Sequence, residues 1–114
     1  MFGLSVRWSL TDAPDGTLER LHAYVEEVSL PRFAGLDGLR YKTWRARDGE
    51  WFEGTYVFVS EEARAQFQAS FTATAGTAPG TELIGSPPVL IEAFEVVAAV
   101  RGPAGFRSAA RFEG

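Results

Sequence analysis

One histidine is the first candidate for chemistry in this sequence. His22 is the only histidine of the chain. It lies four residues after Leu18 and three before Val25, so it borders the apolar stripe of a predicted helix. At that border it could act as a general acid or base, or bind a ligand by a hydrogen bond, in a cleft between helix and sheet. The alternative is a partly exposed histidine without a role in chemistry.

Aromatic side chains are the second candidate. They make up 13% of the chain, with nine Phe, three Tyr and three Trp. Those in predicted strands are Trp8, Tyr41, Trp44, Trp51 and Tyr56, and two in a predicted helix are Phe67 and Phe71. A subset could line a ligand pocket, since such pockets are mostly apolar and aromatic. The alternative is that they fill the core or the interface of a dimer.

Charged residues also fall inside predicted strands: Arg7, Glu53, Glu92 and Glu95. Any that are buried need partners, because an unpaired buried charge is costly. We expect Arg7 to pair with Glu92 on a neighbouring strand, at an edge of the sheet. Anchoring of a charged substrate is the alternative.

Several site types are excluded or disfavoured. Without cysteine there are no disulfides, thiolate nucleophiles, zinc fingers or iron–sulfur clusters. There is no GxGxxG motif and no glycine-rich phosphate loop ending in Lys. One histidine does not make the usual multi-histidine metal site, and haem would need His22 as its axial ligand. We therefore expect no cofactor and no metal.

Charge and hydropathy disfavour two classes of partner. The net charge is −4 and the basic residues are dispersed, whereas nucleic-acid binding needs a concentrated basic face. No apolar run approaches the roughly 20 residues that span a bilayer. Arg7 and Asp12 come too early for a secretory signal. We expect a cytoplasmic protein that binds neither nucleic acid nor membrane.

The elements that must position these residues begin with a strand over 4–10, where apolar and polar residues alternate. A turn over 12–16 leads into a helix that Asp15 or Thr17 caps, that runs to about Ser29 and that Pro31 ends. A second strand over 39–46 and a third over 51–59 flank Asp48-Gly49, a hairpin signal.

Ser60 then caps a second helix, whose apolar stripe is Ala63, Phe67 and Phe71. Residues 72–88 predict an irregular connection with a helical turn near 79–83. A fourth strand follows over 89–100. One domain therefore covers residues 1–100, and residues 101–114 form a tail that is either flexible or in contact with a partner.

Because side chains alternate along a strand, odd and even positions are assigned to opposite faces of the sheet. In the second strand, Leu39, Tyr41 and Thr43 point one way and Arg40, Lys42 and Trp44 the other. Trp8 lies on the face of the first strand that we expect to face the helices. The third strand is apolar on both faces, with Tyr56 and Phe58 on one and Val57 and Val59 on the other, which is typical of a strand covered on both sides.

The order strand, helix, strand, strand, helix, strand predicts an α+β, ferredoxin-like fold with a four-stranded antiparallel sheet. Right-handed crossovers place both helices on one face of that sheet. The other face then needs a cover, because large apolar surfaces are rarely left exposed. A second copy would supply it, so we expect a homodimer that closes into a dimeric α/β barrel.

Two segments carry a family resemblance: Gly38-Leu-Arg-Tyr-Lys-Thr-Trp44, and Glu53-Gly-Thr-Tyr-Val-Phe-Val-Ser60 with the helix start to Phe67. They resemble the YdhR-like monooxygenases of the dimeric α/β-barrel group, which includes the antibiotic-biosynthesis monooxygenases. Lys42-Thr-Trp44 matches the family's strand ending, whereas Gly54-Thr55 stands where the family has paired glycines. The likeness follows the element order over residues 3–98 and is sharp over 38–67.

The resemblance implies a cofactor-independent monooxygenase, or a related cyclase or isomerase, that acts on a small aromatic or polyketide-like molecule. On this interpretation the catalytic candidates are His22, Tyr41 and Tyr56, and the substrate-binding candidates are Trp8, Trp44, Phe67 and Phe71. Two other functions stay open: a non-catalytic or stress-associated dimer that binds a small molecule, and a structural module whose aromatic residues only pack.

Overall fold

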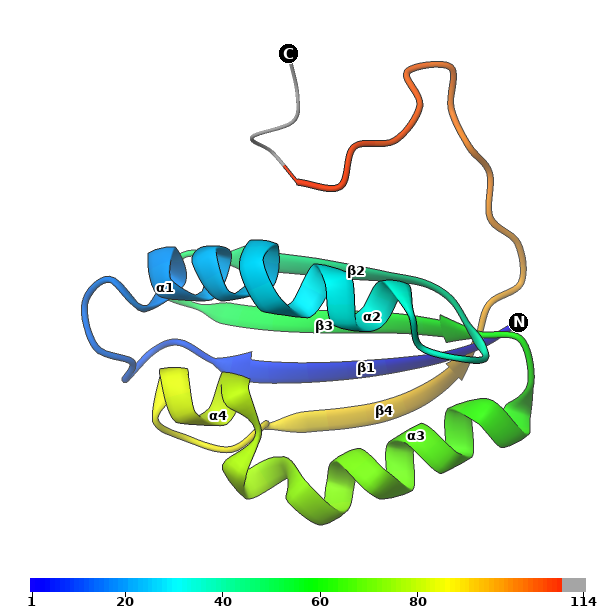
Figure 1. The fold of residues 1–114 in the computed structure, drawn as a ribbon. Helices are drawn as coiled ribbons and strands as arrows, with labels where there is room; N and C mark the ends of the chain where they lie inside the picture. The colour runs from blue at the N-terminus through cyan, green and yellow to red at the C-terminus, as the bar shows by residue number, and fades with distance from the viewer. Residues whose placement is uncertain (110–114) are drawn as a thin grey trace.

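A four-stranded antiparallel sheet forms the centre of the molecule (Figure 1). Its strands are β1 (Phe2–Ser9), β2 (Leu39–Arg47), β3 (Trp51–Phe58) and β4 (Leu90–Glu95), in the spatial order β2-β3-β1-β4. The structure is a computed structural model and describes residues 1–109. The element order and the sheet confirm the predicted ferredoxin-like α+β fold.

The helices form two runs that lie against one face of the sheet. The first run is α1 (Thr17–Tyr24), the π-helical turn η1 (Val25–Ser29) and α2 (Leu30–Ala34). The second is α3 (Glu61–Thr74), η2 (Ala75–Thr77) and α4 (Pro79–Ile84). Within residues 1–109, none of these helices is long and apolar enough to cross a membrane.

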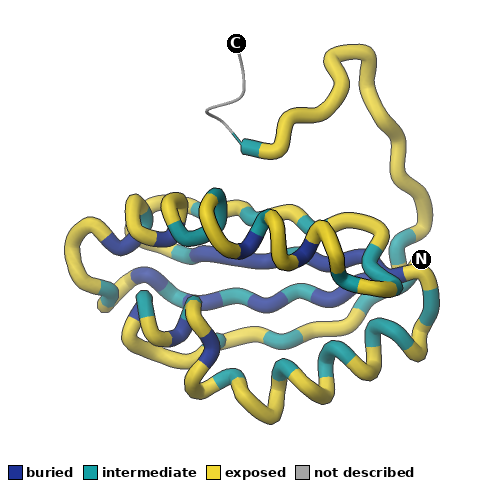
Figure 2. The backbone as a smooth tube through the Cα atoms, in the orientation of Figure 1, coloured by how far each residue is buried: buried dark blue, intermediate teal, exposed yellow. Residues whose placement is uncertain are grey.

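The core lies between these helices and the sheet (Figure 2). Leu4, Val6 and Trp8 of β1 are buried there against Leu21 of α1 and Ile84 of α4. Alternate residues of β1 supply these side chains, as the period of two predicts. Apolar burial on this face is therefore what holds both helical runs on the sheet.

The first helical run continues past the predicted stop at Pro31, so that prediction is wrong. The N–H of Leu30 bonds to the carbonyl of Val25, five residues back, which makes η1 a π turn. Pro31 consequently falls in the first turn of α2, where a missing N–H leaves no helical bond unmade. The predicted side-chain cap is also wrong. Gly16 at φ 80° holds the N-cap, and the Thr17 hydroxyl donates to the Pro14 carbonyl instead.

Three local predictions are confirmed. The Ser60 hydroxyl accepts from the N–H of Ala63 at 3.1 Å and caps α3. Gly49 takes the left-handed conformation, φ 74°, at the turn between β2 and β3. A short helix, α4, forms where a turn was predicted over 79–83.

The fourth strand ends at Glu95 rather than at Val100. The N–H of Val96 bonds to the carbonyl of Met1, so β1 has no further residue with which to pair. Residues 96–109 leave the sheet as an extended segment (Figure 1). The predicted tail begins within it at residue 101, and its last residues, 110–114, lie outside the described part of the chain.

A shift of register in β2 corrects the predicted faces. The pairing with β3 slips between Leu39 and Tyr41. Leu39 therefore packs against the core, whereas Tyr41 is 41% exposed and lies opposite Val57, away from the helices. A bulge adds a residue to one strand, so parity fails across it.

Candidate functional site

An aromatic cavity of about 70 Å³ lies between the sheet and both helical runs. Its strand residues come from the edge strand β2 and the two central strands β3 and β1, and residues of both helical runs close it. Five of the seven sequence-predicted site residues line it: Trp8, Trp44, Tyr56, Phe67 and Phe71. The fold thus brings together side chains that lie up to 63 positions apart (71 − 8) in the sequence.

Phe33 of α2 is the ring at which the aromatic walls meet. Its centroid lies 5.9 Å from Trp44, 5.6 Å from Tyr56 and 6.1 Å from Phe67, each with tilted or edge-on planes. Such edge contacts are favourable and directional, so the walls are held without a ligand. Phe33 is not among the sequence-predicted site residues, because α2 lies beyond the predicted helix end at Pro31.

Trp8 is held in place by α4. Its indole N–H donates to the Thr81 hydroxyl at 3.0 Å, and that hydroxyl donates to the Ala75 carbonyl at 2.7 Å. Gly80 lies against the ring, where an added Cβ would come within 3.0 Å of indole Cζ2. The short helix and its glycine therefore fix the orientation of one cavity wall.

A single amine enters this aromatic cavity. Nζ of Lys42 lies 3.6 Å from the ring centroid of Phe33, 4.1 Å from that of Tyr56 and 4.4 Å from that of Trp44. It donates to the Tyr56 hydroxyl at 2.9 Å. Lys42 is the only lysine of the chain and shares a strand face with Trp44, a signal that could have marked it as a site residue.

The surroundings of Lys42 and Tyr56 favour their neutral forms. Burial lowers the pKa of Lys42 well below its ordinary value of 10.5, and the positive charge of Arg32 lowers it further. The three ring faces act in the opposite direction, because they attract an ammonium. Burial raises the pKa of Tyr56, which stays a phenol. The cavity therefore places an amine whose protonation burial disfavours beside a phenol whose ionisation burial disfavours.

A larger cleft of about 420 Å³ adjoins the cavity, and Lys42, Trp44, Phe52 and Val25 line both. His22 lines this cleft from α1, with an exposed side chain. Phe106 and its neighbours to residue 109 form the opposite wall. The structure thus places His22 at the cleft rather than in the cavity. Tyr41 is among the lining residues of neither space.

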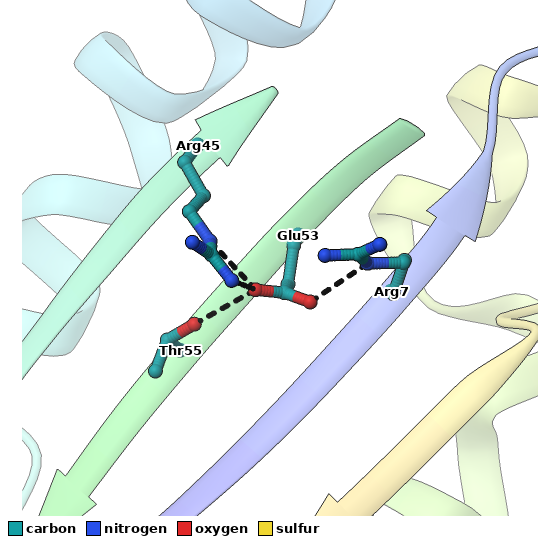
Figure 3. A network of polar contacts seen from close by, with 4 residues as sticks. All are labelled: Arg7, Arg45, Glu53 and Thr55. Carbon is teal, nitrogen blue, oxygen red and sulfur yellow. Dashed lines mark hydrogen bonds and ion pairs between the residues drawn. The ribbon is translucent and has the colours of Figure 1, made fainter. Parts of the chain in front are cut away.

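The opposite face of the sheet carries a separate polar cluster (Figure 3). Glu53 accepts from Arg7 Nε at 2.8 Å, from Arg45 Nε at 2.7 Å and from the Thr55 hydroxyl at 3.2 Å. The predicted pair of Arg7 with Glu92 is wrong, because the register sets Arg7 opposite Glu53 and Glu92 opposite Ser5.

The polar cluster changes the expected character of that face. Val57 is apolar there, but Glu53, Thr55 and Arg7 occupy its centre, so the face is not the continuous apolar surface predicted for β3. Glu53 exposes only 2% of its side chain, since the two arginines cover it. The cluster belongs to the sheet surface and not to the aromatic cavity.

Acidic and histidine side chains do not gather into a metal-binding group within residues 1–109. Rings line much of the cavity and cleft, and the polar groups among the lining residues include the Lys42 amine, the Tyr56 hydroxyl, the Arg32 guanidinium and the exposed His22. Such a set suits an aromatic ligand with one polar substituent.

Two solved structures share this fold. A protein of unknown function from Nitrosomonas europaea, NE2512, is 24% identical, with a TM-score of 0.62 over 89% of this chain and 93% of that one. A monooxygenase from the gene ActVA-Orf6 of Streptomyces coelicolor, in complex with nanaomycin D, is 19% identical, with a TM-score of 0.62 over 89% and 91%. No family model and no curated protein matches the sequence. The chain therefore shares its ferredoxin-like α+β fold with these two proteins.

Proposed function

We propose that this protein is a cofactor-independent monooxygenase that acts on a small hydroxylated aromatic or polyketide-like molecule. The observation that carries the proposal is the ring-walled cavity with one buried amine, open to a larger cleft through shared residues. A monooxygenase with the same fold binds nanaomycin D, which supports a ligand of this class. The sequence likeness to YdhR-like monooxygenases supports it as well.

The two spaces suit two reactants of unequal size. The cleft of about 420 Å³ falls within the range of small-molecule sites, roughly 300–1,000 Å³. The cavity of about 70 Å³ has room for a small molecule such as dioxygen. Oxidation of an anthrone methylene to a carbonyl balances with dioxygen alone: CH₂ and O₂ give C=O and H₂O, and the substrate supplies all four electrons.

Oxygen consumption with a panel of hydroxylated anthrones and quinols tests the proposal. We expect Trp44→Leu to lower kcat/KM by about tenfold or more, equal to roughly 1.4 kcal/mol, because it removes a wall shared by cavity and cleft. Trp51→Leu is the matched control, since that tryptophan lies under Arg7 and Arg45 on the opposite face.

Two further outcomes test the role of His22 and distinguish an enzyme from a binding protein. We expect His22→Ala to reduce the rate, and an unchanged rate would remove His22 from the mechanism. Binding of the panel without any oxygen uptake would reject the monooxygenase and favour a small-molecule-binding protein.

We also propose a cytoplasmic homodimer, in which the helix-free face of the sheet meets that of a second copy.

A further inference from the structure

We propose that the Lys42 amine is the base that takes the proton of an acidic hydroxyl on the ligand and then holds the resulting anion. The site would accordingly select phenols, hydroxyquinones and enols over their ethers. This inference rests on the proposed function, because it assigns the ligand to the same pocket. It goes further by naming the ligand group that is recognised and the atom that recognises it.

The position of Nζ is the first support. Lys42 lines both the cavity and the cleft, so a ligand in the cleft can bring a hydroxyl to the amine. Gly54 lies beside the lysine on the next strand, where an added Cβ would come within 3.1 Å of Lys42 Cε. The absence of that Cβ leaves the lysine room to enter the cavity.

The hydrogen bonding of the amine is the second support. Among residues 1–109 the amine has one hydrogen-bond partner, the Tyr56 hydroxyl, and makes no ion pair with a carboxylate. Its other contacts are the faces of three rings. A lysine that served only to pack or to form an ion pair would not leave its amine in an aromatic cavity without an anion.

The charges around the amine set its protonation state. Arg32 of α2 lines the cavity and opposes a second positive charge, Tyr24 of α1 is the other titratable group on the helical wall, and His22 and Glu26 line the cleft. Burial and the charge of Arg32 lower the pKa of Lys42 well below 10.5, so these surroundings make the ammonium less favourable than it is in water.

The proton transfer balances without another reactant. A ligand hydroxyl gives its proton to the Lys42 lone pair, leaving a ligand oxyanion and a Lys42 ammonium, with no net change of charge in the site. The two new charges then pair in an apolar enclosure, where their attraction is strong. Tyr56, whose pKa burial raises, stays protonated and can donate its hydrogen bond to the oxyanion.

Para-nitrophenol and its methyl ether, para-nitroanisole, test the inference directly, because only the phenol can lose a proton and its anion is yellow. In the wild-type protein, at a pH where free nitrophenol is colourless, we expect the bound phenol to be yellow. Its apparent pKa should fall by at least about one unit, a tenfold change in ionisation. We expect Lys42→Met to bind nitroanisole as the wild type does, while nitrophenol stays colourless.

Arg40→Met is the matched control, because Arg40 is an exposed cation on the same strand, and we expect it to keep the yellow colour. A colourless bound phenol in the wild type, or a yellow one in Lys42→Met, would overturn the inference. Failure of the wild type to bind nitrophenol would overturn it as well.

A measurement on the wild-type protein needs no variant. Since Lys42 is the only lysine, isotope-labelled lysine gives one Cε signal in NMR. We expect this signal to titrate well below pH 10.5, and titration at the ordinary value would overturn the inference. If nitrophenol binds as the anion but no substrate consumes oxygen, the monooxygenase proposal fails while the role of Lys42 stands.

Discussion

Two enclosed titratable residues, Lys42 and Glu53, lie on opposite faces of the same sheet and have opposite surroundings. Glu53 accepts hydrogen bonds from two arginines and one hydroxyl, which satisfies both carboxylate oxygens. Lys42 has one neutral hydroxyl and three ring faces. A carboxylate whose oxygens all accept hydrogen bonds from protein groups is typical of a structural ion pair. An enclosed amine that has no anionic partner is instead typical of a binding site.

Glu53 should make stability depend on pH. Burial raises its pKa, but the hydrogen bonds of Arg45 and Arg7 outweigh that effect and hold the pKa below the ordinary 4.5. The stabilisation is therefore present above about pH 4.5 and is lost as the pH falls through the lower pKa of the folded state. In Glu53→Gln this dependence should disappear.

Denaturant unfolding at several pH values measures this effect. At neutral pH we expect Glu53→Gln to cost about 1–2 kcal/mol, less than a fully buried pair because Arg45 is 59% exposed. The control Glu50→Gln removes the exposed pair with Arg47 and should change stability by less than about 0.5 kcal/mol. Equal pH profiles for Glu53→Gln and the wild type would contradict the prediction.

At the scale of the elements, two local irregularities build the aromatic site. The π turn η1 places Pro31 in the first turn of α2, and α2 then carries Phe33 to the centre of the cavity. The bulge in β2 turns Tyr41 away from the helices. Predictions from hydrophobic periodicity assume regular helices and strands, and for this reason they include Tyr41 and omit Phe33.

Gly54, which lies opposite Trp44 and diagonal to Lys42 on the neighbouring strand, should control the position of the amine. A Cβ at position 54 would lie 3.1 Å from Lys42 Cε and 3.4 Å from Tyr56 Cε1, so the flexible lysine must give way. We expect Gly54→Ala to move the pKa of Lys42 toward its ordinary value, because the displaced amine meets more water. The NMR titration of the single lysine measures this shift.

Gly76→Ala is the matched control for Gly54→Ala, because nothing lies within 4 Å of the Cβ it would add. Both variants should unfold within about 1 kcal/mol of the wild type, the usual scale of a glycine-to-alanine change. A Lys42 titration in Gly54→Ala that matches that of Gly76→Ala would show that this glycine does not position the amine.

At the scale of the whole molecule, the sheet has one face covered by helices and one without them. The helix-free face is mixed: Phe94 lies over Gly3 beside Val57, while Glu53 and the two arginines occupy its centre. The arginines keep further N–H donors on this surface, so a second copy would find polar as well as apolar contacts. We therefore expect a polar dimer interface.

Light scattering at micromolar concentration tests the homodimer. We expect a dimer for the wild type and a monomer for Ser5→Arg, because Ser5 lies on the central strand between Thr55 and Glu92 and a long side chain there would hold the two sheets apart. Ser86→Arg, in the exposed loop before β4, should remain dimeric. A monomeric wild type would reject the dimer.

Local patterning in the sequence is enough to predict the order of elements, the hairpin at Gly49, the cap at Ser60 and most of the cavity rings. Which side chains meet across the sheet, and between the sheet and the helices, follows from the tertiary structure. Strand register paired Arg7 with Glu53, the bulge removed Tyr41 from the cavity side, and α2 brought Phe33 over Lys42. These features depend on how separate segments of the chain pair, and a shift of one residue in strand register moves every side chain to the other face of the sheet. Hydrophobic periodicity along the chain therefore does not predict them.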